Sequence, residues 1–365
     1  MTGAADARYM ALALSLGRRG LGRVWPNPAV GCVIVKDGQI IGRGWTADGG
    51  RPHAETAALA QAEQTAKGAT AYVTLEPCAH HGKTPPCAQA LIDAEVARVV
   101  VATGDPDPRV AGQGIAMLEA AGIAVAQGVL KDQADIDHCG FFLRITENRP
   151  FVTLKLAGTL DGRIATATGE SQWITGAEAR RAVHMMRARH DAVMVGAGTA
   201  RADDPSLTVR GLGIKQQPVR VVLSRAMDLS PDLHLAKTAH SVPVWICHEA
   251  GASVQPWTDQ GAVSLPCAMS SGAVDPRDAM RALAQKGITR VFCEGGGMLA
   301  ASLLNAGLVD RLVVFSAGMA IGAEGTPMLA AMGVAKLDEA PCFDLVRVSR
   351  LGADICHTWE RSTTP

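Results

Sequence analysis

Three short segments in the first quarter of the chain carry a pattern that requires them to meet in space. They read HAE at 53–55, EPC at 76–78 and PPC at 85–87. A catalytic zinc takes three protein ligands and leaves a fourth position for water, and His53, Cys78 and Cys87 supply one imidazole and two thiolates. We therefore expect any fold of this chain to gather these segments around one metal ion.

Glu55 gives this predicted metal site a chemical task. A carboxylate beside the metal takes a proton from the activated water and passes it to a ring nitrogen and to the leaving ammonia. Positions two apart on a regular helix point to different sides, so the site is expected to wrap around the start of a helix. A helix N-terminus also favours anions and is predicted to help keep Cys87 as a thiolate.

The spacing of these residues is typical of zinc deaminases that act on nucleobase rings, which carry His-x-Glu, then Pro-Cys and a second Cys. Here Cys78 and Cys87 are separated by the insert AHHGKTPP, longer than in the usual pattern. The alternative is a closed structural zinc site, for which His80 and His81 are possible fourth ligands. That alternative leaves Glu55 without a role, and we interpret His80 and His81 as loop or substrate contacts.

The composition argues against nucleic-acid and membrane partners. Lys plus Arg and Asp plus Glu number 35 each, so the net charge is zero, and aromatic residues make up only 4%. Nucleic-acid binders need basic surfaces, and single-strand binders need aromatic platforms. The apolar stretch from Tyr9 to Leu16 is too short to span a bilayer. We expect a cytoplasmic enzyme with a small-molecule substrate and reduced cysteines.

The first part of the chain alternates strands with helices. A hairpin is predicted over 29–45 with an Asp-Gly turn, then an Ala-rich helix from His53 to Gly68, a strand from Ala71 and another over 97–103. This alternation predicts an α/β layered domain, which we place at residues 1–146.

The pattern restarts near residues 147–150, and short β-branched strands again alternate with helices. One predicted helix begins after Thr175, which stands in capping-box spacing with Glu178. The chain closes with an apparent hairpin, DLVRVSR and DICHTWER. These features predict a second α/β domain over 147–365.

Two glycine-rich turns in the second half suit a bound dinucleotide. The segment VFCEGGGMLAASLL reads as a strand, a glycine turn and a helix, and GAGTARADD is a second glycine-rich strand exit. Helix N-termini and close backbone approach favour phosphate groups. The first segment is not the usual dinucleotide fingerprint, and a tight structural turn explains it equally well. Arg187 and Arg210 are cations suited to bidentate phosphate binding, although a lone Arg is more often a surface residue.

Longer stretches of the chain resemble one family in order along the sequence. PNPAVG at 26–31, HAE, EPCAHHGKTPPC and GDPDPRVAGQG resemble the deaminase half of the bifunctional RibD family of riboflavin biosynthesis. KLAGTLDGRIA, GESQWIT and ADDPSLTVR resemble its reductase half. The resemblance implies a cytidine-deaminase-like fold for 1–146 and a dihydrofolate-reductase-like fold for 147–365.

The resemblance also implies two reactions on one phosphoribosylaminopyrimidine. The first domain would hydrolytically deaminate 2,5-diamino-6-(5-phosphoribosylamino)pyrimidin-4(3H)-one to 5-amino-6-(5-phosphoribosylamino)uracil. The second would reduce the ribosyl group to ribityl with NADPH, by hydride delivery after opening of the sugar ring to an imine. The enzyme would use Zn²⁺ and NADPH, and we expect it to be a homo-oligomer.

Site residues are carried over position by position. His53, Cys78 and Cys87 match the zinc ligands and Glu55 the proton carrier. The positions that match substrate contacts are Asn27, Lys83, Asp105, Lys155, Ser171, Arg187, Leu207, Arg210 and Glu294. The positions that match cofactor contacts are Ala157, Trp173, Thr199, Asp203, Ser224, Gly296, Gly297, Met298, Leu299, Ala300, Ala301 and Ser302.

Three of these assignments have open points. Thr46 stands where the family often has His, which affects a substrate contact and not the metal chemistry. Lys155 lies on a strand and either assists ring opening or is structural. Ser224 is expected to meet the ribose 2′-phosphate with Arg225 nearby, although Arg225 alone is better explained as a solvated charge.

Two other functions compete with this interpretation. One is a zinc deaminase of nucleic acid with an accessory second domain, against which the zero net charge and scarce aromatics count. The other is a metabolite sensor without catalysis, against which an intact Glu55 counts.

Overall fold

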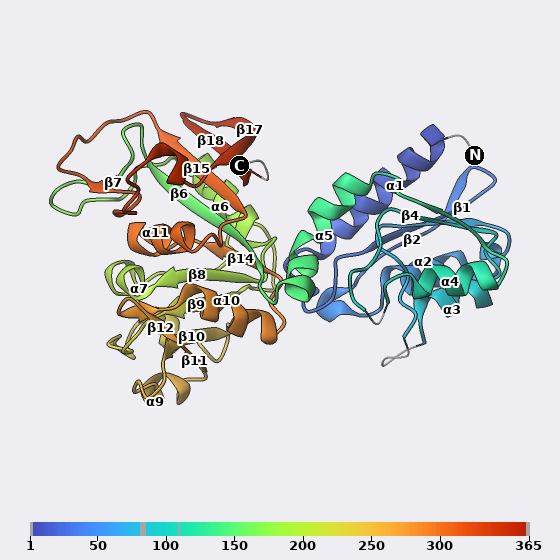
Figure 1. Cartoon of the computed structure of the whole chain (residues 1–365), viewed down its shortest axis with the longest axis horizontal. Helices are drawn as coiled ribbons and strands as arrows, with labels where there is room; N and C mark the ends of the chain where they lie inside the picture. Colours follow the sequence, from blue (N-terminus) through green and yellow to red (C-terminus); the bar gives the residue numbers. More distant parts are fainter. Residues whose placement is uncertain (1–2, 81–84, 109, 363–365) are drawn as a thin grey trace. The chain divides into compact units, whose positions relative to one another are not determined.

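The computed structural model describes residues 3–80, 85–108 and 110–362. The chain folds into two compact units, Met1–Arg149 and Pro150–Pro365, and each is defined by contacts among its own residues (Figure 1). Helix α5 (Lys131–Thr146) closes the first unit. Within the described residues, no helix is both long and apolar enough to cross a membrane.

The first unit is built on a five-stranded sheet with the order β2-β1-β3-β4-β5. Its strands are β1 (Gly31–Lys36), β2 (Gln39–Trp45), β3 (Thr70–Val73), β4 (Arg98–Val101) and β5 (Ala124–Gln127). Strand β1 is antiparallel to β2 and β3, and the remaining pairs are parallel. The predicted hairpin is confirmed, and Asp37 and Gly38 both have positive φ, as its tight turn requires.

Helices cover both faces of this sheet, giving three layers (Figure 1). They are α1 (Gly3–Gly17), α2 (Ala54–Ala62), α3 (Cys87–Asp93), α4 (Gln113–Ala120) and α5. Successive side chains of a strand point to opposite faces. Cys32 and Ile34 therefore enter the core beneath α2, α3 and α4, whereas Val33 and Val35 enter the core beneath α1 and α5.

Two glycines of β2 set the position of α2. A Cβ on Gly44 would lie 2.1 Å from the carbonyl oxygen of Ala54, and one on Gly42 would lie 2.3 Å from that of Ala58. Only glycine allows the helix backbone to approach the strand this closely. This packing fixes the first turn of α2, which carries the HAE motif.

The second unit is built on a nine-stranded sheet with the order β11-β10-β9-β8-β14-β6-β15-β18-β17. Its strands are β6 (Phe151–Thr159), β8 (Ala192–Gly196), β9 (Val219–Leu223), β10 (Val244–Glu249), β11 (Val263–Cys267), β14 (Arg290–Cys293), β15 (Arg311–Ala317), β17 (Phe343–Leu351) and β18 (Asp354–Arg361). The pairs from β11 to β15 are parallel, and the closing hairpin of β17 and β18 is antiparallel.

Helices and short strand pairs complete the second unit. The helices are α6 (Ala177–Arg187), α7 (Ala197–Asp203), α8 (His234–Lys237), α9 (Gln255–Thr258), α10 (Pro276–Gln285) and α11 (Gly297–Asn305). Two small pairs of strands join β7 (Arg163–Ala165) to β16 (Thr326–Pro327) and β12 (Met269–Ser270) to β13 (Ala273–Val274).

Two local predictions are wrong. The helix after His53 ends at Ala62, and a 3-10 turn over Glu63–Ala66 replaces its last part, because Glu63 adopts a positive φ. The capping box from Thr175 to Glu178 does not form. Helix α6 is capped by Gly176, whose N–H donates to the carboxylate of Asp354 at 2.7 Å, so a distant acceptor satisfies the helix start.

Two candidate active sites

The predicted zinc ligands converge in the first unit. The Nδ1 atom of His53 lies 3.3 Å from the Sγ atom of Cys87 and 3.7 Å from that of Cys78. All three ligand atoms lie within 4.8 Å of one another, close enough to share one ion. An imidazole with two sulfurs is a donor set that suits zinc, so these residues fit the metal that the motif implies.

The ends of two helices position this cluster. His53 is the N-cap of α2 in an extended conformation, and Glu55 lies in the first helical turn. This confirms that the site wraps around the start of a helix. Cys87 is the first residue of α3, and its backbone N–H donates to the Sγ atom of Cys78 at 3.3 Å. The first backbone N–H of α3 therefore forms a hydrogen bond with the sulfur of Cys78.

The hydrogen bond between the two sulfurs shifts their pKa values in opposite directions. The hydrogen bond from Cys87, followed by that from His53, lowers the pKa of Cys78 to about 4. The same bond to Cys78, together with burial, raises the pKa of Cys87 far above its usual range. That the start of α3 helps keep Cys87 as a thiolate stays a prediction. A zinc ion would require both sulfurs as thiolates, so its binding would be coupled to the loss of their protons.

Glu55 is buried beside this cluster. Burial, and then the negative charge of Cys78, raises the pKa of Glu55 to about 7. A group whose pKa lies near neutrality can both accept and return a proton. The position and the environment of Glu55 fit the proton carrier that the sequence predicts.

A cavity of about 210 Å³ opens beside His53, Glu55 and Cys78. Asn27 and Asp105 line it, as expected for substrate contacts, and so does His80. His80 does not belong to the three-ligand cluster of the described residues, which favours an open site over a closed one. Lys83 and His81 lie outside the described residues, so their predicted roles stay predictions.

Sequence reasoning missed several residues of this cavity. Arg51, Phe141 and Arg144 line it, the last two from α5. Helix α5 begins more than forty positions after the metal motifs and carries no motif of its own. Its spacing shows only a packed helix, so no sequence signal points to the cavity.

Glu76 is a second buried carboxylate that sequence reasoning left without a task. One of its oxygens accepts the N–H groups of Gly114 and Ile115, at 3.0 and 3.3 Å. The other accepts those of Gly112 and Asp105, at 3.0 and 3.4 Å. Glu76 therefore ties the segment that carries Cys78 to the loop that carries Asp105.

Thr46 takes a structural position in the cavity wall. Its hydroxyl accepts the N–H of Val30 and donates to the carbonyl of Pro28, both at 3.0 Å. These contacts use the hydroxyl hydrogen and an oxygen lone pair to hold the loop that follows Asn27. The residue that replaces the family's frequent His therefore supports the loop instead of offering a cation.

The second unit contains a larger cavity of about 620 Å³. It gathers all six substrate positions predicted for this half, which are Lys155, Ser171, Arg187, Leu207, Arg210 and Glu294. It also gathers four predicted cofactor positions, which are Ala157, Trp173, Thr199 and Asp203. His184 lines the cavity as well and was missed, because its position on α6 resembles any partly buried helical residue.

Arg187 and Glu294 form an ion pair in this cavity. Arg187 donates to both carboxylate oxygens of Glu294, at 2.5 and 3.1 Å. Burial alone would raise the pKa of Glu294, but the charges of Arg187 and Lys155 outweigh it and leave the pKa lowered. The fork of Arg187 is occupied by this carboxylate, and its contact with substrate stays a prediction.

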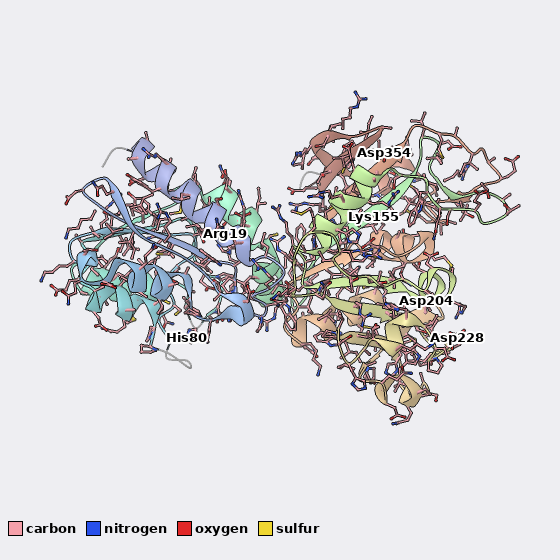
Figure 2. All side chains as sticks on the ribbon, turned by 180° about the vertical axis from the view of Figure 1, so that it is seen from behind. Arg19, His80, Lys155, Asp204, Asp228 and Asp354 are labelled. Atoms are coloured by element: carbon pink, nitrogen blue, oxygen red, sulfur yellow. The ribbon has the colours of Figure 1, made fainter. Side chains whose placement is uncertain are left out.

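Lys155 lies within the second unit, whereas Asp204 and Asp228 lie at its surface (Figure 2). Burial lowers the pKa of Lys155, and the charge of Glu294 opposes this effect. A lysine with a lowered pKa gives up a proton more readily than a solvated one. This supports a chemical role over a purely structural one.

The two glycine-rich turns meet in space. The N–H of Gly296 donates to the hydroxyl of Thr199 at 3.1 Å, which links the start of α11 to α7. A Cβ on Gly297 would lie 3.0 Å from the backbone nitrogen of Ala330, so that position is tightly packed. The predicted cofactor contacts over 296–302 are not tested by this geometry. Ser224 is buried and Arg225 exposed, and their contact with the 2′-phosphate also stays a prediction.

Two family models match the chain. One, described as the RibD C-terminal domain, matches residues 150–357. The other, described as the cytidine and deoxycytidylate deaminase zinc-binding region, matches residues 4–103. These matches agree with a cytidine-deaminase-like first half and a dihydrofolate-reductase-like second half.

Known proteins are similar to the chain over almost its full length. The riboflavin biosynthesis protein RibD of Escherichia coli is 41% identical, with 96% of this chain and 98% of that protein covered. The RibD of Aquifex aeolicus is 40% identical, with 98% of each covered. The solved structure of Acinetobacter baumannii RibD, form 1, is 39% identical with a TM-score of 0.91, over 99% of this chain and 100% of that one.

A second solved structure carries a description of its chemistry. It is a diaminohydroxyphosphoribosylaminopyrimidine deaminase/5-amino-6-(5-phosphoribosylamino)uracil reductase from Thermotoga maritima. It is 35% identical to this chain with a TM-score of 0.87, and 99% of each chain is covered.

Proposed function

The chain belongs to the RibD family of riboflavin biosynthesis, and from this membership we propose how its residues carry out two successive reactions. It is a bifunctional enzyme, a zinc-dependent deaminase and an NADPH-dependent reductase. We assign deamination to a domain over residues 1–146 and reduction to a domain over 147–365. The observation that supports the first assignment most directly is the convergence of His53, Cys78 and Cys87 beside Glu55.

The first reaction exchanges the exocyclic amino group of the diaminopyrimidinone for oxygen. Zinc, when held by the triad, supplies a Lewis acid that makes water nucleophilic at neutral pH. Glu55 takes the proton of that water and returns protons to the ring nitrogen and to the leaving ammonia. Its pKa of about 7 suits both directions of transfer.

The substrate ring lies in the smaller cavity in this proposal. Asn27 and Asp105 contact the pyrimidine, and Lys83 contributes from the segment outside the described residues. Asn27 is held in place because its amide nitrogen donates to the carbonyl of Gly50 at 3.0 Å. Glu76 and Thr46 act one step away, by fixing the loops that carry Asp105 and follow Asn27.

The second reaction reduces the ribosyl group of 5-amino-6-(5-phosphoribosylamino)uracil to ribityl. NADPH, when bound, supplies the hydride. We assign its binding to Ala157, Trp173, Thr199, Asp203, Ser224 and the start of α11 over 296–302. The sugar is held by Ser171, Leu207 and Arg210, and by the pair of Arg187 and Glu294. Lys155 assists opening of the sugar ring to the imine that is reduced.

A pair of coupled assays tests this proposal. The purified enzyme should release ammonia from the diaminopyrimidinone and contain zinc, and it should oxidise NADPH only when the deaminated ribosyl substrate is supplied. Ammonia release without any NADPH oxidation on that substrate would reject the reductase assignment.

The variant Glu55→Gln isolates the proton carrier. It should keep zinc and lose roughly a hundred- to ten-thousandfold in ammonia release, the usual size of general acid-base catalysis. NADPH oxidation on the deaminated substrate should stay unchanged, which controls for folding. A near-normal rate of ammonia release in this variant would show that Glu55 does not carry the proton.

We also propose that the enzyme acts in the cytoplasm on small molecules, without nucleic acid or membrane, as a homo-oligomer. All nine cysteines lie within the described ranges and none is in a disulfide, as in a reducing compartment. Sedimentation at micromolar concentration tests the assembly state, and a purely monomeric enzyme would contradict it.

A further inference from the structure

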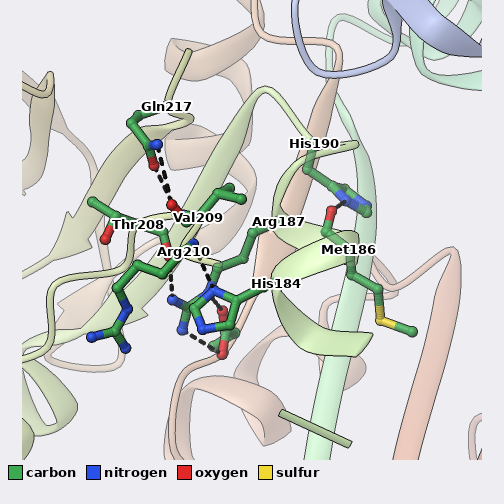
Figure 3. A network of polar contacts seen from close by, with 9 residues as sticks. His184, Met186, Arg187, His190, Thr208, Val209, Arg210 and Gln217 are labelled. Carbon is green, nitrogen blue, oxygen red and sulfur yellow. Dashed lines mark hydrogen bonds and ion pairs between the residues drawn. The ribbon is translucent and has the colours of Figure 1, made fainter. Parts of the chain in front are cut away.

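One face of helix α6 lines the reductase cavity. Its residues follow the spacing of three and four that places helical side chains on one side, and they are Arg180, Val183, His184 and Arg187. Arg187 donates to the carbonyl of Thr208 at 2.9 Å, and His184 accepts the N–H of Arg210 at 3.3 Å (Figure 3). Arg180, in the first turn of the helix, makes its contacts with a different segment.

Arg180 holds the loop that joins β7 to α6. Its guanidinium carbon lies 4.6 Å from the centre of the Trp173 ring, within the range of a cation–π contact. Its Nη1 donates to the carbonyl of Thr175 at 2.6 Å. Within the described residues, this is the one hydrogen bond that residues 171–175 make, so the conformation of the loop around Trp173 depends on Arg180.

Trp173 presents an open aromatic face to the cavity. Its side chain lines the cavity and is 67% exposed. The guanidinium of Arg180 covers one face of the indole, so the opposite face can accept a second planar group. Aromatic side chains stack on flat rings, and NADPH carries two of them, the nicotinamide and the adenine.

The position of the cavity decides between these two rings. The same cavity gathers the residues that we assign to the substrate. A hydride passes directly between reacting atoms, so the part of the cofactor that lies beside the substrate must be the nicotinamide. The ring that stacks on Trp173 is therefore the nicotinamide.

The charge of Arg180 distinguishes the two redox forms of this ring. The nicotinamide is neutral in NADPH and cationic in NADP⁺. Stacked carbon atoms lie about 3.5–4 Å apart, which places the guanidinium, 4.6 Å behind the indole, roughly 8 Å from the ring. At that distance a positive charge repels the cationic ring, and water screens only part of the repulsion.

We propose that Arg180 is a positioning residue that holds the indole of Trp173 against the nicotinamide, and that its charge makes the reductase site prefer NADPH over NADP⁺. The cation–π contact and the bond to Thr175 fix the indole from behind. Once the hydride has left, the ring becomes cationic, and the same charge favours release of the spent cofactor.

This inference rests on the proposed reductase function, so its test measures binding and does not depend on turnover. Titration calorimetry of the full-length enzyme gives the dissociation constants of NADPH and NADP⁺, and their ratio is the redox-form preference. A merely structural role of Arg180 would weaken both cofactors alike and leave this ratio unchanged. A charge behind the nicotinamide changes the ratio.

Two substitutions of Arg180 separate its charge from its shape. Arg180→Gln keeps a planar group that can donate to Thr175 but removes the charge, so the preference for NADPH should fall by roughly three- to tenfold. Arg180→Lys keeps the charge and should retain the preference. Both cofactors should bind it several-fold more weakly, because an ammonium lacks the flat face that holds the indole.

Trp173→Ala tests the stacking itself. It should weaken the binding of both cofactors by about tenfold, the size of one lost aromatic stacking contact. Unchanged NADPH affinity in this variant would overturn the stacking assignment.

Arg181→Gln is the matched control, since Arg181 is an exposed cation on the same helix that does not line the cavity. It removes the same charge and should keep both wild-type dissociation constants. An equal ratio in the wild type and Arg180→Gln would overturn the role of the charge, and it would exclude the nicotinamide as the ring on Trp173.

Failure of the proposed function gives a different result. If Arg180→Gln lowers the preference for NADPH, yet the wild type never oxidises NADPH on the deaminated ribosyl substrate, the nicotinamide site stands and the reductase assignment falls. If the wild type oxidises NADPH on that substrate but the ratio is the same in every Arg180 variant, the reverse holds.

Discussion

The two cavities of this enzyme neutralise buried charge in opposite ways. The deaminase cavity brings two cysteines and an imidazole together beside Glu55, an arrangement that fits a bound cation. The reductase cavity pairs its own charges, with Glu294 against Arg187 and Lys155. The first site is therefore completed by a metal, whereas in the second a buried carboxylate is balanced by cations of the chain.

This difference has a consequence for how each site responds to change. The metal ligands all come from residues 53–87, and two of them lie at helix starts. A substitution in this segment should therefore affect the metal site and leave the second unit unchanged. In the reductase cavity, Lys155 comes from β6 and Arg187 from α6, and Glu294 follows β14 more than a hundred positions further along the chain. A change at one of them disturbs partners on other elements.

Removal of the metal tests the contrast most severely. Cys78→Ala, or treatment with a strong chelator, should lower ammonia release by about a thousandfold or more, because water then keeps its ordinary pKa. NADPH oxidation should persist, since the three metal ligands all lie in the first unit. Zinc content and both rates measure this, and parallel loss of both activities would break the comparison.

Acidification should act on the reductase unit through His190. Its imidazole is buried and satisfied in the neutral form, with Nδ1 donating to the carbonyl of Met186 at 2.7 Å and Nε2 accepting from Thr153 at 2.9 Å. Burial lowers the pKa of His190 to about 3. Between that value and the unfolded value of about 6.5, the unfolded chain binds the extra proton, so stability falls as the pH falls.

From pH 7 to pH 5 this group should cost the unit about 2 kcal/mol of unfolding free energy. The urea concentration that halves the reductase activity reports it at each pH. His190→Gln should show a flatter pH dependence than the wild type. Equal slopes for the two proteins would mean that His190 is not the group responsible.

The smallest expected effect concerns the wall of the deaminase cavity. Thr46→Val keeps the shape of the side chain but removes its hydrogen bonds to the N–H of Val30 and the carbonyl of Pro28, which keep only their bond to each other at 3.1 Å. A hydrogen bond contributes about 0.5–1.5 kcal/mol, part of which should appear as a loss of several-fold in kcat/KM for ammonia release. Thr46→Ser keeps the hydroxyl and should stay near wild type. Equal activity of the Val and Ser variants would contradict the supporting role.

Most of the deaminase site could be predicted from sequence because its chemistry is local. The metal pattern lies within one short stretch, and a hydroxide-generating zinc requires those donor types at helix or strand ends. The reductase site could be predicted only through its resemblance to a family. No periodicity connects Lys155 with Glu294, and only the neighbouring positions of β6 and β14 in the sheet bring them together.

Other features had no sequence signal at all. Arg144 lines the smaller cavity from α5, and Asp354, which is 178 positions away along the chain, accepts the N–H of Gly176 at the start of α6. The sequence pattern also failed to predict the end of α2 at Ala62. The alanines of this segment favour a longer helix, but the positive φ of Glu63 ends it.

The sequence by itself determined the zinc cofactor, the order of strands and helices, and the family, and it predicts the proton carrier, since each depends on residue types at short spacing. The tertiary structure decided which charges meet. In the folded chain Arg187 binds Glu294, Arg210 is exposed, and the hydroxyl of Thr46 stabilises the loop that follows Asn27. The physical reason is that hydrogen bonds and ion pairs act over a few ångströms, whereas their partners lie tens to hundreds of residues apart along the chain.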